Sequence, residues 1–191
     1  MIDTNLLVVK YCEPILPPRP RQLQHARQVL DAVSHGDVTG YVAMQTWMEF
    51  AHVYVKSFYS KELSANRNKY LPGMRAAFPS IKQDDRFHWN HLLKTRTSFL
   101  KDIVPDLRLI EQNFIYDNLW LLQPNDLGAW KPEDKTFAST LLEFMHKHEL
   151  DSGDAMIVIE AKRIGCQAIV SMDRDIQKVS KDLDVYTWST S

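Results

Sequence analysis

The sequence predicts an α/β fold in which helices cover both faces of a central parallel sheet. Short apolar runs at 40–44, 119–123 and 167–173 alternate along the chain with longer segments of helical periodicity. Parallel strands need long crossover connections, which are usually helical, so this alternation favours a parallel sheet between two helical layers. The 191 residues, 45% hydrophobic and 25% charged, suit one domain over residues 1–191.

The first half of the chain begins with a very short strand and is otherwise mainly helical. Residues 1–3 end that strand, and residues 4–12 suit a helix with a buried face. After a proline-rich connection, apolar residues recur at helical spacing over 22–35, and Gly36 provides a helix stop. A strand at 40–44 precedes a helix at 45–58, whose apolar surface is broken by Glu49.

The second half follows the same alternation. We expect helices at 61–71, 84–103, 106–119 and 131–148, with a strand at 119–123. A buried helix over 151–165 begins at a capping residue, Asp151 or Ser152, and stops at Gly165. Strands at 167–173 and 185–188 complete the predicted sheet.

Positive charge is concentrated in one segment. Ten basic residues and only three acidic ones lie between Lys56 and Lys101, although the whole chain has a net charge of -1. This asymmetry indicates a polyanionic partner, and a solvated helical surface is the alternative interpretation.

Composition argues against a membrane or secreted protein. No apolar stretch approaches the roughly 20 residues that a membrane span requires, and the N-terminus has no signal-peptide pattern. Cys12 and Cys166 are not spaced as a metal-binding pair, so we expect free thiols in a reducing cytoplasm.

Four carboxylates interrupt segments that otherwise call for apolar residues. Asp3 and Asp173 end strands, Glu49 interrupts a helix, and Asp154 lies in the first turn of the buried helix. Each has a local alternative: a helix cap for Asp3, a solvated position for Glu49, a favourable dipole for Asp154 and a turn for Asp173. Because strand ends and the following helix starts share one edge of a parallel sheet, we expect the four to converge.

Converging carboxylates repel one another and favour a divalent cation. Two unit charges 4 Å apart cost about 4 kcal/mol near a protein surface. An oxygen-only donor set points to Mg²⁺ or Mn²⁺ rather than to zinc. Beside a basic surface, such an ion suggests phosphodiester cleavage.

Four motifs give the chain a resemblance to the PIN domain family. The segments "IDTNLLV", "WMEF", "SGDAMIVIEAKRIG" and "IVSMDRDI" resemble the acidic motifs of that family, in that order, over roughly 1–58 and 119–188. The resemblance implies a three-layer α/β/α nuclease fold with a central parallel sheet. It assigns Asp3, Glu49, Asp154 and Asp173 to the four catalytic, metal-binding acids, Asp175 to a further acid, and Thr4, Asn5 and Ser171 to supporting polar positions.

Many PIN domains are VapC-type toxins, which are Mg²⁺- or Mn²⁺-dependent endoribonucleases. The resemblance therefore implies RNA as the substrate, a small antitoxin protein that occludes the site, and a homodimer. The chain departs from a compact toxin of this type by a helical, basic insertion at about 59–118. Basic residues of this insertion are expected to hold the RNA backbone: Arg67, Lys69, Arg75 and Arg96.

Three aromatic residues could stack on unpaired bases, with helix packing as the alternative: Tyr59, Tyr70 and Trp89. Two other functions stay open. One is a PIN-like module that binds RNA or protein without cutting, and the other is a structure-specific DNA nuclease.

Overall fold

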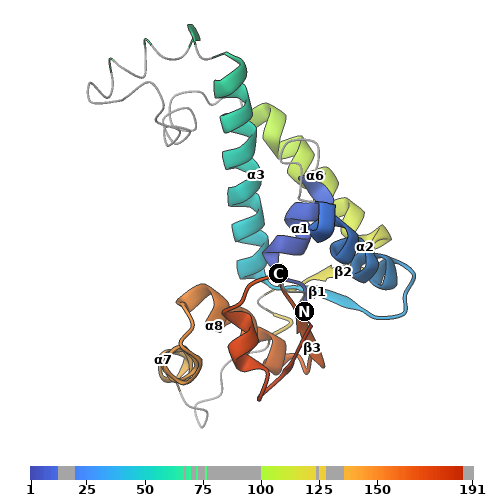
Figure 1. The fold of residues 1–191 in the computed structure, drawn as a ribbon, viewed down its shortest axis with the longest axis vertical. Coiled ribbons are helices and arrows are strands. Elements are labelled where there is room, and N and C mark those ends of the chain that lie inside the picture. Colours follow the sequence, from blue (N-terminus) through green and yellow to red (C-terminus); the bar gives the residue numbers. More distant parts are fainter. Residues whose placement is uncertain are drawn as a thin grey trace.

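The computed structural model describes residues 1–12, 20–66, 68–69, 72, 76, 100–123, 125–127 and 136–186. Helices and strands alternate along the chain, as Figure 1 shows. In chain order the elements are α1 (Thr4–Tyr11), α2 (Pro20–Ser34), β1 (Gly40–Val42), α3 (Met44–Ala65), α6 (Leu100–Tyr116), β2 (Leu119–Leu121), α7 (Phe137–His148), α8 (Ser152–Arg163), β3 (Ala168–Val170), the 3-10 helix η2 (Ile176–Val179) and β4 (Asp184–Tyr186).

The strands form two parallel pairs that a single residue connects. β1 pairs with β2, and β3 pairs with β4. Ile2 makes parallel bridges to Val42 of β1 and to Val170 of β3, so the N-terminal segment lies between the two pairs. The mixed α/β class and the parallel pairing are confirmed. In place of one continuous central sheet, the described residues form two pairs of three-residue strands joined through Ile2.

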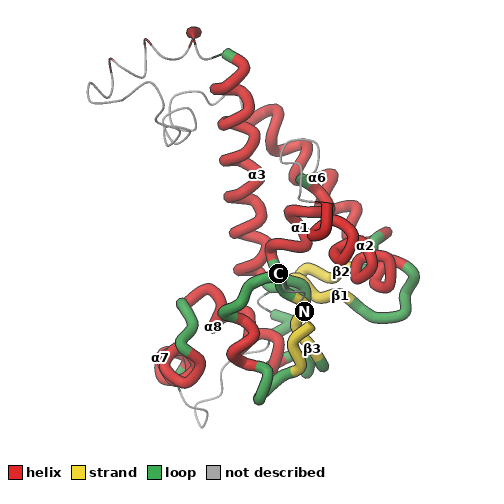
Figure 2. The backbone as a smooth tube through the Cα atoms, viewed as in Figure 1, coloured by secondary structure: helices red, strands yellow, loops and turns green. Residues whose placement is uncertain are grey.

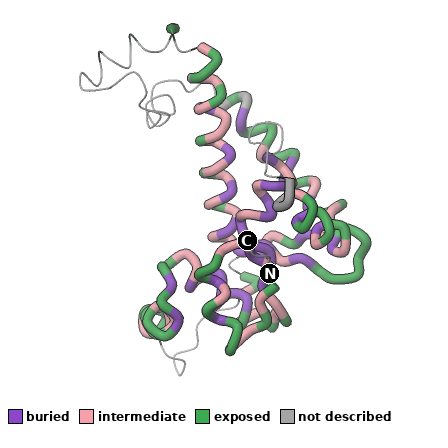
Figure 3. Tube along the Cα trace, in the orientation of Figure 1, coloured by how far each residue is buried: buried purple, intermediate pink, exposed green. Residues whose placement is uncertain are grey.

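Two hydrophobic cores lie on opposite sides of the strands. Ile2 and Val42 pack in one core with side chains of α1, α3 and α6, whereas Met1 and Ala43 pack in the other with side chains of α8. Neighbouring residues in an extended chain point to opposite faces, which explains this division. Figure 2 shows the strands between the α1, α2, α3 and α6 group and the α7 and α8 pair, and Figure 3 shows buried residues gathered around them.

The long helix α3 differs most from the predicted elements. It continues from Met44 to Ala65 and therefore includes the start of the separate helix predicted at 61–71. Buried Phe50, Tyr54 and Tyr59 give it an apolar face that packs in the same core as α1 and α6. This packing explains the continuity of the helix, since tertiary burial outweighs weak local preferences. None of the helices within the described ranges is long and apolar enough to cross a bilayer.

The basic insertion predicted at about 59–118 is only partly described. Its ends belong to α3 and to α6, which runs through Pro105 and combines parts of two predicted helices. Most of the segment between these two helices, including much of the helix predicted at 84–103, lies outside the described residues.

Candidate functional site

The chain topology creates a site at the carboxyl ends of the strands. From Ile2 the chain adds β1 and then β2 on one side, and later adds β3 and β4 on the other side. The order of the strands therefore reverses at Ile2, and open parallel sheets bind ligands outside the carboxyl ends at such a reversal. Asp3 follows Ile2 directly, α3 begins just after β1, and the segment that contains Asp173 follows β3.

Asp3 is buried and held by three donors. Only 5% of its surface is exposed. Its Oδ1 accepts the backbone N–H of Thr4 at 2.6 Å, and its Oδ2 accepts the Ser171 hydroxyl at 2.5 Å and the Asn5 amide at 3.3 Å. Burial raises the pKa of the Asp3 carboxyl, these donors lower it, and the charge of Glu49 raises it further. The side chain also caps α1, so the predicted local role and a role in the site coexist.

Glu49 projects from α3 toward the beginning of α8. Its Oε2 accepts the Thr4 hydroxyl at 2.9 Å, and its Oε1 accepts the Gln45 amide at 2.9 Å. A Cβ atom built on Gly153 would lie 3.0 Å from Glu49 Oε1. The absence of a side chain at Gly153 therefore leaves room for this carboxylate against the first turn of α8.

The charges of the other acids of the site raise the pKa of Asp154. Its pKa is raised to about 7, first by burial and then by the charges of Asp151, Asp173, Asp3 and Glu49. Asp151 is a sequence neighbour of Asp154, whereas Asp3, Glu49 and Asp173 come from other parts of the chain, and the charges of all four act on Asp154. The structure thus brings Asp3, Glu49, Asp154 and Asp173 into one neighbourhood, which we call the carboxylate site.

The loop after β3 connects Asp3 with Asp173. The Ser171 hydroxyl that donates to Asp3 also accepts the backbone N–H of Asp173 at 2.9 Å. Asp175 donates its N–H to Asp173 Oδ1 at 2.9 Å, but its own carboxylate points to Lys178, with Oδ1 2.8 Å from Nζ. Asp175, predicted as a further metal ligand, is therefore engaged in an ion pair.

Three residues next to the carboxylate site were not assigned to it from the sequence. Asp151 was interpreted only as a cap, a role it fills by accepting the N–H of Asp154 at 2.9 Å, yet its charge also acts on Asp154. Gln45 lies four residues before Glu49, a helical spacing that places the two side chains together. Lys178 lies three residues after Asp175, and this spacing indicates their ion pair less clearly than the helical spacing indicates the contact of Gln45 with Glu49.

Most of the predicted RNA contacts lie outside the described residues, namely Arg67, Arg75 and Arg96. Lys69 is exposed beyond the end of α3. Glu49 and Ala65 are about 24 Å apart along the α3 axis at 1.5 Å per residue, and Lys69 follows this far end of the helix. Its contact with RNA stays a prediction. The suggested stacking role of Tyr59 is wrong, because Tyr59 is fully buried in the core, while Tyr70 and Trp89 are not described.

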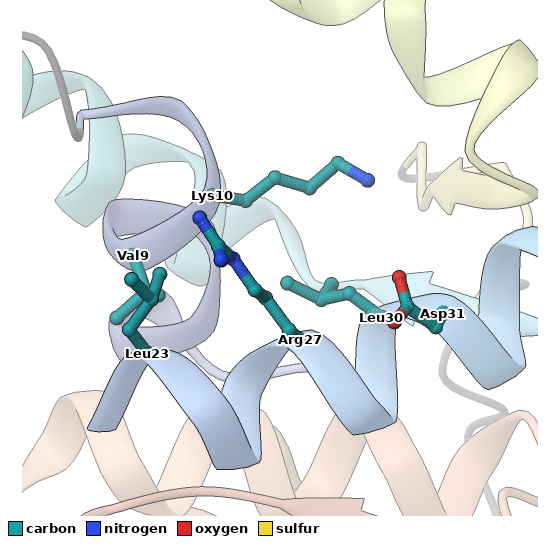
Figure 4. A pocket seen from close by; sticks show the side chains of 6 residues that line it. All are labelled: Val9, Lys10, Leu23, Arg27, Leu30 and Asp31. Carbon is teal, nitrogen blue, oxygen red and sulfur yellow. The ribbon is translucent and has the colours of Figure 1, made fainter. Parts of the chain in front are cut away.

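A small cavity of about 110 Å³ lies elsewhere, between α1 and α2, and is shown in Figure 4. Its lining includes the apolar side chains of Val9 and Leu30 with the charged Lys10. Lys10 pairs with Asp117 at 2.7 Å. The lining contains no residue of the carboxylate site, so this cavity does not extend the site.

The donor set of the carboxylate site fits a hard divalent cation. Its side chains offer only oxygen atoms, which suit Mg²⁺ or Mn²⁺. Across the described ranges, no three Asp, Glu, His or Cys side chains surround one point closely enough to form a ready coordination shell. A cation at these oxygen atoms would offset the negative charges that, after burial, raise the pKa of Asp154.

Residues 114–182 match the model of the PIN domain family, which is a family of metal-dependent nucleases. The matched range contains Asp154, Asp173 and Asp175, whereas Asp3 and Glu49 lie before it. No curated protein and no solved structure gives a significant match to the chain.

Proposed function

We propose that this chain, whose residues 114–182 match the PIN domain model, is a metal-dependent endoribonuclease that acts as a VapC-like toxin. The observation that carries the proposal is the convergence of acids from three parts of the chain: Ser171 donates to Asp3 and accepts the N–H of Asp173, and Thr4 donates to Glu49. The pKa of Asp154, which burial and then the neighbouring acids raise to about 7, supports it. Such strongly perturbed groups gather at functional sites. The match to a family of metal-dependent nucleases adds that such a group of acids can bind a divalent cation and cleave a phosphodiester.

Asp3, Glu49, Asp154 and Asp173 would hold the cation, Mg²⁺ or Mn²⁺. When bound, the cation lowers the pKa of a water and offsets negative charge on the phosphate. In the cleavage step the water oxygen forms a bond to phosphorus and loses a proton to solvent. The bond from phosphorus to the leaving oxygen breaks, and that oxygen takes up a proton from solvent.

The surrounding polar side chains orient the carboxylates before substrate arrives. Ser171 holds Asp3 and the backbone of Asp173, and Thr4 holds Glu49. Hydrogen-bonded partners that fix ligand orientation typically change metal affinity or activity 10- to 100-fold when they are removed. These contacts hold Asp3 and Glu49 in fixed positions, since Asp3 and Thr4 are themselves buried.

Charge distribution supports a nucleic acid as the substrate class. The excess of basic residues between Lys56 and Lys101 suits a polyanion, and α3 connects this segment with the carboxylate site. The toxin role adds two partners: an antitoxin protein that covers the acids with a basic side chain, and a second copy of the chain in a homodimer.

Cleavage of defined single-stranded RNAs tests the proposal. The wild type is expected to cut with Mn²⁺ or Mg²⁺ and to be inactive in EDTA. Asp154→Asn should abolish cleavage while the protein stays folded. Asp37→Asn is the matched control and should keep full activity, because Asp37 is exposed before β1, at the opposite end of that strand from the carboxylate site.

Three outcomes would contradict the proposal that the chain is an endoribonuclease. Undiminished cleavage by Asp154→Asn would exclude the site. Cutting of branched DNA but not of RNA would indicate a structure-specific DNA nuclease. Metal-independent RNA binding without cleavage would indicate a non-catalytic binding module.

A further inference from the structure

We propose that the outer face of α6 is a self-complementary surface on which a second copy of this chain packs with its own α6 antiparallel. In this arrangement Arg108 of each copy faces Glu111 of the partner subunit. The proposed function includes a homodimer, and the inference rests on that part of it while assigning the surface. Cleavage plays no part in the argument, because the association of two chains can be measured without a nucleic acid.

One face of α6 belongs to the core of the chain. Ile103, Ile110 and Phe114 recur at helical spacing and are buried in the core that α6 shares with α1 and α3. Asp106 accepts the hydroxyl of Tyr54, on α3, at 2.8 Å. These contacts fix how α6 is turned about its axis, and Figure 1 shows the helix beside α3. The opposite face of α6 therefore points away from the core.

The face of α6 that points away from the core carries large apolar side chains. Four of the ten large apolar side chains that are exposed in the described residues belong to this one helix, with exposed fractions from 41% to 82%: Val104, Leu109, Ile115 and Tyr116. Single exposed apolar residues are ordinary on a protein surface, whereas a group of them on one face indicates an interaction site.

These side chains lie in two adjacent rows along the helix, since residues three or four positions apart are neighbours on a helix surface. All members of both rows are exposed. The first row consists of Val104, Arg108, Glu111 and Ile115, and the second consists of Pro105, Leu109, Gln112 and Tyr116.

The first row has a mirrored order. Arg108 and Glu111 lie equally far on either side of a point near the middle of α6, and Val104 and Ile115 lie equally far from the same point. An apolar residue thus mirrors an apolar residue, and a cation mirrors an anion. When a two-fold axis relates two antiparallel helices, it brings each position against its mirrored position in the other copy. The row is therefore complementary to itself.

Antiparallel packing about this point would form two ion pairs and two apolar contacts at once. Arg108 would face Glu111 of the partner subunit, and Val104 would face Ile115 of the partner subunit, each contact occurring twice. Val104 and Ile115 are about 16 Å apart along the helix axis, so the four contacts spread over some three turns. Among the described residues neither Arg108 nor Glu111 has an ion-pair partner within its own chain.

A different protein on the same face is the alternative occupant. Such a partner needs no mirrored order on α6, because its own sequence would supply the complementary residues. The second copy is favoured because both charges of the pair stand in one row, at positions that a two-fold axis exchanges.

Sedimentation equilibrium of the full chain over a range of concentrations tests the proposal. The wild type should approach twice the monomer mass of 22.2 kDa as its concentration rises. Arg108→Glu and Glu111→Arg each replace both ion pairs by like charges, so each should raise the dimer dissociation constant about tenfold or more. The double variant Arg108→Glu/Glu111→Arg exchanges the two charges and should return to the wild-type constant.

Two further variants test the apolar contact and the specificity of the charge effect. Ile115→Ser should raise the dissociation constant without lowering the melting temperature of the dilute monomer, because this side chain is exposed in the single chain. Lys181→Glu is the matched control, since it reverses an exposed charge between η2 and β4, where neighbouring Leu183 packs in the α8 core. It should leave the constant unchanged, and circular dichroism establishes that each variant is folded.

A wild type that stays a monomer over the whole range would overturn the inference, whatever else binds α6. A dimer that Arg108→Glu and Ile115→Ser leave unchanged, or that the double variant does not restore, would overturn the assigned surface. Cleavage assays separate this inference from the nuclease proposal. A monomer that cuts RNA would overturn only the inference, whereas a dimer with the expected charge responses that cuts no nucleic acid would overturn only the nuclease.

Discussion

Replacing Asp154 by Asn should make the metal-free protein more stable, and increasingly so as pH rises. The pKa of Asp154 is raised from its ordinary value of 3.8 to about 7. Between these two values the folded state binds the proton more tightly than the unfolded state, so wild-type stability falls with rising pH. The loss starts near pH 4 and levels off above pH 7, where both states are ionised. An asparagine does not titrate and avoids this loss.

The pKa difference corresponds to about 4 kcal/mol, which we reduce to about 2 kcal/mol because solvent screens the half-buried side chain. Part of this effect is already present at pH 5. We therefore expect the stability advantage of Asp154→Asn to grow by about 1 kcal/mol between pH 5 and pH 8.

Urea unfolding in EDTA at pH 5, 6, 7 and 8 measures this advantage, with Asp37→Asn as the control. Adding Mn²⁺ should reverse the order at pH 8, because a cation that binds the folded state stabilises the wild type more than the variant. An advantage that stays constant or shrinks as pH rises would refute the claim that burial and the neighbouring acids hold a proton on Asp154.

Three further substitutions test how the site and the core are built. Ser171→Ala removes the hydroxyl between Asp3 and Asp173, so the free energy of unfolding should fall by about 1–3 kcal/mol and calorimetry should show weaker Mn²⁺ binding; no change in either quantity would contradict this. Gly153→Ala places a Cβ 3.0 Å from Glu49 Oε1 and 3.3 Å from Asp151 Oδ1, so Mn²⁺ affinity should fall while the melting temperature stays equal or rises, because alanine favours the helix. Gly40→Ala places a Cβ 2.5 Å from Leu119 Cδ2 and 2.9 Å from Val33 Cγ1, and this overpacking should lower the free energy of unfolding by about 1–3 kcal/mol in urea titrations, whereas unchanged stability would show that the core can expand there.

Local patterns in the sequence were sufficient for the class of fold and for most elements. The predicted strands at 40–44, 119–123 and 167–173 contain β1, β2 and β3, and the first two helices begin within three residues of their predicted starts. Apolar periodicity reports these elements because each buries one face or one stripe. The extent of α3 was missed, since its length depends on the core that Tyr59 enters rather than on local preference.

The sequence by itself determined which acids stand where apolar residues are expected, and therefore which side chains were candidates for the site. Only the tertiary structure decided how they meet: Ser171 donates to Asp3 across 168 positions of sequence, Gly153 leaves room for Glu49, and Lys178 engages Asp175. The physical reason is that burial and charge at this site arise between strands and helices that are distant in the chain. A local sequence pattern shows which residue type stands at a position. Hydrogen bonds and pKa shifts depend on residues that come close only in the folded chain.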